Sequence, residues 1–490
     1  MTAPLPNGFR ITLDSGVEQL TPDKLIGGSP ARIVSMTAAG HIAWQEIRTG
    51  PVRTAAGGTL ARRLTDAGLA HPHPPETDGP LDVTVVIPVR DRAAMLARCL
   101  AALGDRYPVI VVDDGSHDPH AIAEVAAEAG AKLLRHPANR GPGVARNTAL
   151  DHVTTELVAF LDSDCVPGTG WIGWLAPHFA DPAVAAAAPR ITAFGAAGAV
   201  RRCGLDLGDQ PARVAPNSRV PFVPTAALIM RRSALADVAQ VGFVFDPALR
   251  VGEDVDVIWR LHRAGWRIRY DPAVQVEHEE PATIGDLLIR RFRYGTSAAP
   301  LAQRHPSAIP PLVVAPGPAL TVLAVLMRQP LLAGVGIVMS VCSTIRALRR
   351  AGAPLNRAVP ATVTGVYQTW LGIGRYCTQF AAPLLALACA TPPGRRRSTR
   401  WRWRAAAGSL LLGPAVTRWA KQRNKRNPIG AVLTDIADDI AYGAGVLSGC
   451  LRQRIATPLR PRVVRQVARR ANRSVPQDLS TDKQGEPRGR

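Results

Sequence analysis

The stretch Val158-Ala-Phe-Leu-Asp-Ser-Asp-Cys165 decides which fold the chain is expected to adopt. Its apolar first half is typical of a buried strand, and that strand delivers two carboxylates, Asp162 and Asp164. Because a single residue separates them, both side chains leave the same face of an extended backbone. Carboxylate oxygens suit Mg²⁺ or Mn²⁺, and proteins usually hold Mg²⁺ with one or two carboxylates plus substrate phosphates. Taken alone, the pair is more often a solvated turn than a metal site, so the neighbouring sequence has to decide.

The chain before this stretch alternates between buried strands and helices. Residues 82–89 are apolar on both faces, as a parallel strand requires, and a helix with its apolar side over residues 95–103 follows. Residues 109–115 form a second buried strand, and a helix at 121–129 and a strand at 132–134 complete the pattern. This alternation predicts a doubly wound α/β sheet, whose ligands bind beyond the carboxyl ends of its strands.

Acidic residues stand at three of these strand ends. Asp91 comes just after the first strand, Asp113 and Asp114 end the second, and Asp162 and Asp164 end the stretch quoted above. One acidic strand end is ordinary. Because the carboxyl ends of parallel strands meet at one edge of a sheet, three together predict a site for something cationic or rich in hydroxyl groups.

A glycine-containing loop, Asn139-Arg-Gly-Pro-Gly-Val-Ala-Arg-Asn147, lies between the third strand and the Asp162 strand. Its glycines would let the backbone approach a ligand closely, and Arg140 and Arg146 could pair with phosphate. The alternative is a plain loop that leads into the start of a helix.

Five motifs stand in the order found in a known enzyme family: Val86-Ile-Pro-Val-Arg-Asp91, Val111-Val-Asp-Asp-Gly-Ser116, residues 139–147, Asp162-Ser-Asp164 and Gly252-Glu-Asp-Val-Asp256. From residue 82 to about residue 297 the chain thereby resembles the inverting family-2 glycosyltransferases of the GT-A fold. The resemblance implies a catalytic domain over residues 81–297 that takes a UDP-hexose, expected to be UDP-glucose, with Mg²⁺ or Mn²⁺ as cofactor.

The resemblance also implies a role for individual residues. Asp164 would be the main metal ligand and His278 would assist the metal or the diphosphate, while Asp254 would be the catalytic base. The nucleotide sugar would be bound by residues of all five motifs: Pro88, Asp91, Asp113, Asp114, Asn139, Arg146, Asp162 and Glu253. Asp162 would touch the ribose or the metal.

The chemistry explains why a carboxylate such as Asp254 is needed. When a sugar leaves its diphosphate, the acceptor hydroxyl must lose a proton as it attacks, and one positioned base contributes about 10²–10⁴-fold in rate. The alternative for Glu253-Asp254 is an acidic helix start, which favours the helix dipole and needs no function. The chain departs from the family at Arg290-Arg-Phe-Arg-Tyr-Gly295. Processive members often carry Gln-x-x-Arg-Trp at this place, so the departure argues against processive synthesis.

Residues 1–80 are expected to form a separate small α/β module. Strands are predicted at 9–13 and 32–36, a turn at 25–28, a helix over 60–69 and a linker at His71-Pro-His-Pro-Pro75. The pattern is winged-helix-like, and it resembles the peptide-recognition domains of ribosomal-peptide modification systems. A plain packing domain is the alternative.

Two apolar runs, at residues 310–327 and 330–345, are separated only by Arg328-Gln329 and have basic flanks on both sides. Each approaches the roughly 20 residues of a spanning helix, so residues 298–350 are predicted to be a membrane-associated helical pair with both ends cytoplasmic. The pair either crosses the bilayer or lies within its interface. Buried helices of a large soluble domain are the alternative.

The remainder of the chain, 351–473, is predicted to be a basic helical region, followed by a disordered tail at 474–490. Net charge is +21, and Arg395 to Arg404 alternate with Trp401 and Trp403, as at a membrane interface. We therefore expect membrane lipid as a partner and no nucleic acid. Asp435, Asp438 and Asp439 are expected on a solvated helix face.

The cellular compartment is also suggested by the sequence. Seven cysteines at irregular spacing form no disulfide or metal pattern, and the N-terminus has no secretory signal pattern. The expected location is the cell membrane, with the catalytic domain facing the cytoplasm.

The acceptor is suggested by resemblance alone. Over its whole length the chain is similar to the glycosyltransferases of the mycofactocin system, which implies that glucose units are attached to a peptide-derived redox cofactor. A polyprenyl phosphate or a cell-envelope glycan is the alternative acceptor. From a different class, a catalytically inactive membrane scaffold of the same fold remains open, although the clustered carboxylates argue against it.

Overall fold

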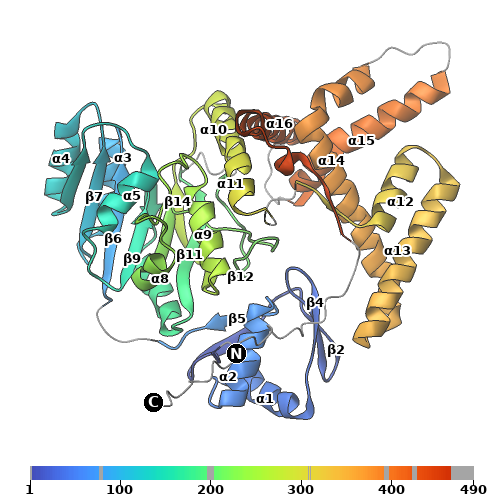
Figure 1. Ribbon diagram of the computed structural model, residues 1–490, viewed down its shortest axis with the longest axis horizontal. Coiled ribbons are helices and arrows are strands. Elements are labelled where there is room, and N and C mark those ends of the chain that lie inside the picture. The colour runs from blue at the N-terminus through green and yellow to red at the C-terminus, as the bar shows by residue number, and fades with distance from the viewer. Residues whose placement is uncertain are drawn as a thin grey trace, which may run out of the picture.

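The computed structural model describes residues 3–76, 81–195, 203–306, 308, 311–390, 397–421 and 427–464, with side chains from 402 onward in the segment that begins at 397. Figure 1 shows three parts: a small N-terminal module, an α/β part built on one large sheet, and a set of long helices. The predicted tail at 474–490 lies outside the described residues.

The large sheet has the strand order β10-β14-β11-β13-β9-β6-β7-β8, with β12 (Ala212–Arg213) beside β14. Its parallel half consists of the predicted strands: β6 (Val83–Val89) lies between β7 (Val109–Asp114) and β9 (Leu157–Leu161). The next strand, β8 (Lys132–His136), pairs with β7. The alternating α/β pattern predicted for this segment is confirmed.

The other half makes the sheet mixed. β13 (Ala227–Arg231) runs antiparallel to both β9 and β11 (Val184–Ala193), and β11 runs parallel to β14 (Arg267–His278). β10 (Cys165–Pro167), which follows the Asp162-Ser-Asp164 turn, pairs antiparallel with the end of β14, and this pairing sets Cys165 opposite His278.

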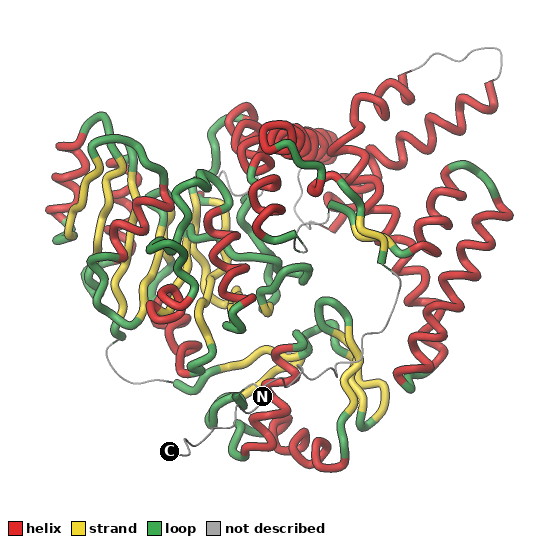
Figure 2. The backbone as a smooth tube through the Cα atoms, viewed as in Figure 1, coloured by secondary structure: helices red, strands yellow, loops and turns green. Residues whose placement is uncertain are grey.

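Helices cover both faces of the sheet, so the doubly wound layout is confirmed (Figures 1 and 2). One core contains residues of α3 (Ala93–Leu103), α4 (Pro119–Glu128) and α6 (Trp171–Leu175). The opposite core contains residues of α5 (Pro142–Leu150), α8 (Arg232–Asp237) and α9 (Glu253–Arg263). All seven residues of β6 are buried, and each fully buried Val or Ile side chain stabilises the fold by about 1.5–3 kcal/mol.

The N-terminal module contains two small sheets and two helices. β2 (Glu18–Thr21), β3 (Lys24–Gly27) and β4 (Arg32–Ser35) form an antiparallel sheet. Helices α1 (Ala38–Thr49) and α2 (Ala55–Asp66) follow, and β1 (Arg10–Leu13) pairs with β5 (Ala70–His73). The prediction of a turn at 25–28 was wrong for most of that range, because Leu25 is fully buried and pairs with Val34. The linker predicted from residue 71 was wrong for His71–His73, because β1 provides a distant pairing partner.

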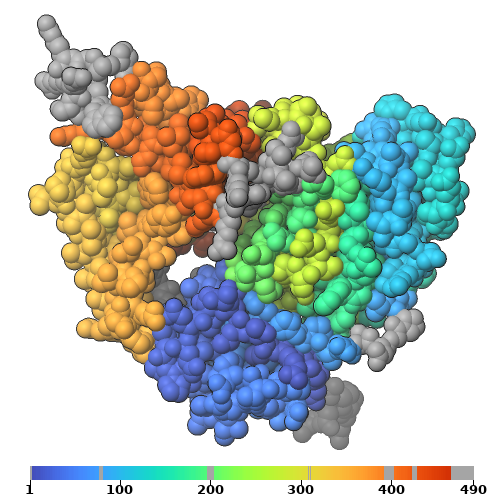
Figure 3. Space-filling model, turned by 180° about the vertical axis from the view of Figure 1, so that it is seen from behind, coloured from blue at the N-terminus to red at the C-terminus, as the bar shows by residue number. Residues whose placement is uncertain are grey.

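Buried ion pairs attach this module to the large sheet. Arg62 of α2 lies 2.7 Å from both carboxylate oxygens of Asp181, and both side chains are 2% exposed. Arg267 of β14 pairs with Asp66 at 2.9 Å. The module also contacts the long helices seen in Figure 3, since Lys24 Nζ donates to the Gly352 carbonyl oxygen.

The long helices follow the sheet in the chain. They are α10 (Ile284–Thr296), α11 (Ala298–Arg304), α12 (Pro316–Leu326), α13 (Pro330–Ala351), α14 (Ala358–Ala390), α15 (Arg397–Lys421) and α16 (Pro428–Gln453). The two predicted apolar runs contain α12 and the first part of α13, which pack against each other (Figure 1). In the part of the chain that the structure describes, α13 alone is long and apolar enough to cross a membrane.

The acidic residues of α16 were expected on a solvated helix face, but they form ion pairs with other helices. Asp439 is 2% exposed and pairs with Arg375 at 2.9 Å and with Arg418 at 2.7 Å. Asp438 pairs with Arg291 of α10 at 2.6 Å, and Asp435 also pairs with Arg418. The predicted solvated face is wrong, because basic residues of three other helices pack onto these carboxylates.

Candidate active site

The site lies where the parallel strands end. β6 and β7 are followed by Asp91 and Asp113-Asp114, and β9 is followed by Asp162 and Asp164. Two helices, α5 and α9, begin close to the same edge, since their residues contact the Asp162 carboxylate directly or through one intermediate side chain. The structure thus brings together strand ends and helix starts that are about 90 residues apart in sequence.

Arg146 of α5 is the cation at the centre of the site. Its Nη2 donates to Asp162 at 2.7 Å and its Nη1 donates to Glu253 of α9 at 3.0 Å. Its side chain is only 3% exposed, and the ring of Phe245 lies against the guanidinium. The sequence suggested that Arg146 pairs with phosphate. Instead, both terminal nitrogens are occupied by carboxylates, so Arg146 joins the Asp162 motif to the Glu253-Asp254 motif.

Burial raises the pKa of three carboxyl groups around Arg146. Desolvation raises the pKa of Asp162 and Asp254, and burial together with the charge of Asp254 raises the pKa of Glu253 to about 7. Desolvation disfavours the ionised form of a carboxyl group, and a second carboxylate nearby adds to the effect. Glu253 is engaged by Arg146, whereas the side chain of Asp254 accepts only the amide N–H of Val255 within the part of the chain that the structure describes. Asp254 is therefore the freer carboxylate of the pair.

Asp164 has positive or potentially positive groups on two sides. Arg92, a half-exposed side chain that the sequence analysis did not single out, pairs with one carboxylate oxygen, and His278 Nε2 lies 3.7 Å from the other. Asp164 is 15% exposed and Asp162 is 30% exposed, so solvent reaches both. The Arg92 guanidinium shows that this position favours a cation. The two carboxylates offer the oxygen ligands that Mg²⁺ and Mn²⁺ prefer, so these residues fit a divalent ion, and the His278 imidazole lies beside Asp164.

The two aspartates at the end of β7, Asp113 and Asp114, are engaged by protein groups. Asp113 is fully buried, accepts the amide N–H of Ser116 at 2.9 Å and pairs with Arg135. Asp114 accepts from His136 Nδ1 at 2.7 Å and from the amides of Arg140 and Gly141 at 2.9 and 2.7 Å. Its carboxylate therefore shapes the loop that leads into α5.

The remaining predicted residues lie around this edge. Asp91 has a positive φ of 58° and accepts both the amide N–H and the ring Nδ1 of His117. Pro88 is buried inside β6 opposite Val112 of β7, so it sets the backbone and offers no polar side chain. Asn139 is exposed in the loop before α5.

Several residues around the site were missed by the sequence analysis. Tyr294 of α10 is one, because burial and the carboxylates of Asp254 and Asp162 raise its pKa to about 12. Glu280 and Arg290 are two more: Glu280 accepts from His278 Nδ1 at 3.3 Å and pairs with Arg290. The one signal in the sequence was the Arg290–Gly295 departure, which places Arg290 and Tyr294 four residues apart on one helix.

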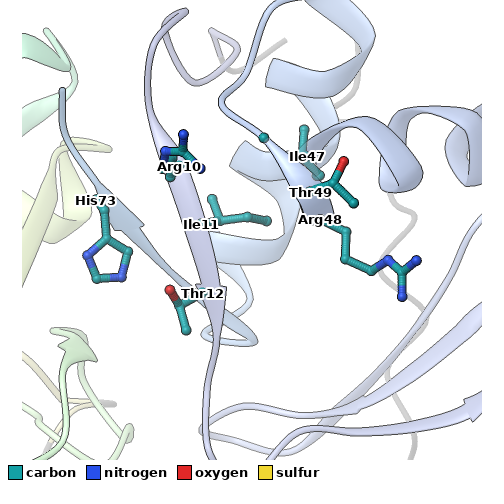
Figure 4. Close-up of a pocket in the computed structure, with 8 residues that line it drawn as sticks. Arg10, Ile11, Thr12, Ile47, Arg48, Thr49 and His73 are labelled. Atoms are coloured by element: carbon teal, nitrogen blue, oxygen red, sulfur yellow. The ribbon is translucent and has the colours of Figure 1, made fainter.

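Two cavities lie outside this site. A cavity of about 280 Å³ in the N-terminal module is lined by β1, the end of α1 and His73, and Figure 4 labels Arg10, Arg48 and Thr49 among its residues. A cavity of about 290 Å³ lies between β5 and β14 and is lined by His71, His178 and Arg269 among others. Neither lining includes the carboxylates at the strand ends.

Comparisons with known proteins agree with this geometry. The sequence model described as Glycosyl transferase family 2 matches residues 84–239. The pre-mycofactocin glycosyltransferase of Mycobacterium tuberculosis is 37% identical over 477 residues, which cover 94% of this chain and 98% of that protein. The succinoglycan biosynthesis protein ExoU of Rhizobium meliloti is 31% identical over 39% of this chain and 59% of its own length.

Among solved structures, a mannosyltransferase from Pyrobaculum calidifontis in complex with GDP-Man and Mn²⁺ aligns over 70% of this chain and 90% of its own, at 19% identity and a TM-score of 0.37. A TM-score that low supports no conclusion about this chain. The pre-mycofactocin glycosyltransferase, which matches along almost the whole of both sequences, does support a conclusion about the family. The family model also covers the strands that carry the site. The chain therefore belongs to glycosyl transferase family 2 and is similar over nearly its whole length to the pre-mycofactocin glycosyltransferases.

Proposed function

We propose that this chain is a metal-dependent, inverting hexosyltransferase that moves glucose from UDP-glucose to a hydroxyl group of the peptide-derived redox cofactor mycofactocin. The observation that carries the acceptor is the 37% identity, along 94% of this chain, to an enzyme named for pre-mycofactocin. The observations that carry the chemistry are the carboxylates around Arg146 and the freer carboxylate of Asp254 beside them.

The proposed reaction assigns a task to each group of the chain. The bond between the anomeric carbon and the diphosphate breaks, a bond from the acceptor oxygen forms on the opposite face, and UDP leaves with the electron pair. Asp254 takes the proton of the acceptor hydroxyl, and its raised pKa improves it as a base near neutral pH. Arg146 holds the carboxylates of Asp162 and Glu253 in place through its two ion pairs.

A divalent cation would be held by Asp164, with Asp162 and His278 close to it. When bound, it supplies positive charge against the negative charge that develops on the departing diphosphate. The exposed guanidinium of Arg92 pairs with the same Asp164 carboxylate and would have to move when the cation and donor bind.

A second acceptor deserves a test because of the long helices. Large apolar side chains are exposed along α12, α13 and α14, which favours membrane association and hence a lipid-linked acceptor such as a polyprenyl phosphate or a growing envelope glycan. For either acceptor we propose that the protein lies at the cell membrane with its catalytic domain in the cytoplasm.

The decisive experiment measures UDP release and sugar transfer by the purified full-length protein. UDP-[¹⁴C]glucose is supplied with Mn²⁺ or with EDTA, and pre-mycofactocin and a polyprenyl phosphate are offered separately. We expect label in pre-mycofactocin, loss of turnover with EDTA, and loss in Asp164→Ala. Label in the lipid fraction alone would show that the acceptor is the polyprenyl phosphate and not pre-mycofactocin. No turnover and no nucleotide binding with any common nucleotide sugar would instead support an inactive scaffold.

A further inference from the structure

Glu280 is a buried carboxylate with a complete set of partners. Its side chain is 1% exposed, and one oxygen lies 3.3 Å from Nδ1 of His278 while the other pairs with Arg290. The Cys203 sulfur also lies within 4.8 Å of this carboxylate. A buried charge is tolerated where several donors satisfy it, and this one is held at a fixed place immediately behind the site.

The contact with Glu280 decides which nitrogen of His278 faces the site. A carboxylate accepts only, so Nδ1 of His278 must carry the proton that it donates. In the neutral imidazole, Nε2 is then the nitrogen with the free lone pair, and it is the one that lies 3.7 Å from Asp164. A carboxylate behind a ligating imidazole fixes the tautomer and the ring orientation and makes the imidazole a stronger ligand.

Arg290 connects this arrangement to α10. Its guanidinium pairs with Glu280, and the next residue, Arg291, pairs with Asp438 of α16. Two adjacent arginines on one helix therefore hold, respectively, the carboxylate behind the active-site histidine and a helix of the C-terminal region. Nothing in the family resemblance predicts this, because the motif at this point departs from the family at Arg290 itself.

An alternative is that Cys203, His278 and Glu280 bind a metal ion themselves, since their ligand atoms lie within 4.8 Å of one another. The guanidinium of Arg290 already balances the charge of Glu280, and Nδ1 of His278 is used as a donor. An ion at this place would have to displace both contacts, so the cluster is better explained as a support for His278.

We propose that Glu280, held by Arg290, is a positioning residue that fixes the His278 ring so that Nε2 points to the divalent cation at Asp164. This inference rests on the proposed function, because it assumes that a cation binds there. It assigns no contact between Glu280 and the substrate.

The test measures cation binding directly. Free Mn²⁺ is quantified by electron paramagnetic resonance as the donor-free, full-length protein is titrated. Glu280→Met removes the acceptor behind the imidazole and should weaken Mn²⁺ binding about 10–100-fold. Glu280→Gln keeps an acceptor oxygen and should restore part of the affinity. The matched control is Glu279→Met at the neighbouring position, where the carboxylate pairs with the surface residue Arg98, and it should bind Mn²⁺ as the wild type does.

The arginines provide a second matched pair. Arg290→Met should weaken Mn²⁺ binding in the same direction as Glu280→Met, whereas Arg291→Met should leave it unchanged. Equal Mn²⁺ affinity in Glu280→Met and wild type would overturn the proposal.

A readout on the unaltered protein covers the case in which Glu280→Met does not fold. The ¹⁵N shifts of labelled histidine should show His278 protonated at Nδ1, and an Nε2–H tautomer in the wild type would also overturn the proposal. Failure of the proposed function looks different: the wild type would neither bind Mn²⁺ nor release UDP, while the tautomer would still report on the Glu280 contact.

Discussion

The guanidinium of Arg146 lies 2.7 Å from the Asp162 carboxylate, and this contact ties the middle of α5 to the end of β9. The same side chain reaches Glu253 at the start of α9. Two neighbouring elements and a helix that begins about 90 residues after Asp162 therefore share one buried cation. Its Nε has no hydrogen-bond partner among the described residues, so the polar contacts of the side chain are the two ion pairs, and the Phe245 ring packs against the guanidinium.

Replacing Arg146 with methionine should harm both stability and transfer. Two carboxylates would lose their counter-charge, and breaking a buried pair in this way typically costs about 3–5 kcal/mol. Urea unfolding of Arg146→Met measures this cost, and Arg140→Met, an exposed arginine of the same loop, is the control. A loss below about 1 kcal/mol would show that Arg146 is not the central cation.

Asp254→Asn should abolish transfer and leave the fold intact. Loss of the base is expected to lower kcat by about 10²–10⁴-fold. Asp256, two residues further on in α9, is the contrasting position, since it is 1% exposed and pairs with Arg260, Arg304 and His305. Asp256→Asn should therefore lower the melting temperature, whereas Asp254→Asn should not. Near-normal transfer by Asp254→Asn would show that Asp254 is not the catalytic base.

The pH dependence of transfer should reveal the raised pKa of the base. Asp254 must be deprotonated to accept a proton, and burial raises its pKa, so kcat should fall as the pH drops through a value above the usual range of about 3.9–4.3. The carboxyl groups of Asp162 and Glu253 lie close by, so the measured value belongs to the group as a whole. The residual activity of Asp254→Asn should lack this acid limb. An acid limb near pH 4 in the wild type would contradict the prediction.

The strand ends were predictable from the sequence because local pattern determines them. Continuous apolar runs predicted β6, β7 and β9, and the acidic residues that end them fell at one edge of the sheet, as the parallel topology requires. The start of α9 at Glu253-Asp254 was predictable for a similar reason, since a glycine and an acidic pair mark it, whereas the role of Asp254 was inferred from the family resemblance. These features depend on a few consecutive residues.

Contacts between residues that are distant in the sequence were not predictable in this way. No local pattern shows that Arg146 faces Glu253 rather than a phosphate, or that Arg291 reaches Asp438. The strand at His71–His73 escaped prediction because Pro72 disfavours a strand and its partner, β1, lies about 60 residues earlier. In each case the missing information is a contact between distant segments.

The exposed apolar face of α13 provides a test of membrane association. Only 22% of its most apolar 18 residues is buried, and Leu331 and Val338 are 85% and 60% exposed. Transferring such side chains from water to an apolar phase is worth about 1.5–3 kcal/mol each. We therefore expect the full-length protein to float with phosphatidylglycerol vesicles. Leu331→Gln combined with Val338→Gln should weaken that binding on the order of a hundredfold, because the lost transfer energies add.

The control for this prediction is Val241→Gln. Val241 is 97% exposed but belongs to a turn in the α/β part of the molecule, so its replacement removes exposed apolar surface without touching α13. Vesicle binding by this variant should equal that of the wild type. Equal flotation of the α13 double variant would mean that electrostatic attraction from the net charge of +21 is sufficient, and that the apolar face of α13 contacts something other than lipid. High salt separates these cases, because salt screens charge attraction and leaves apolar insertion intact.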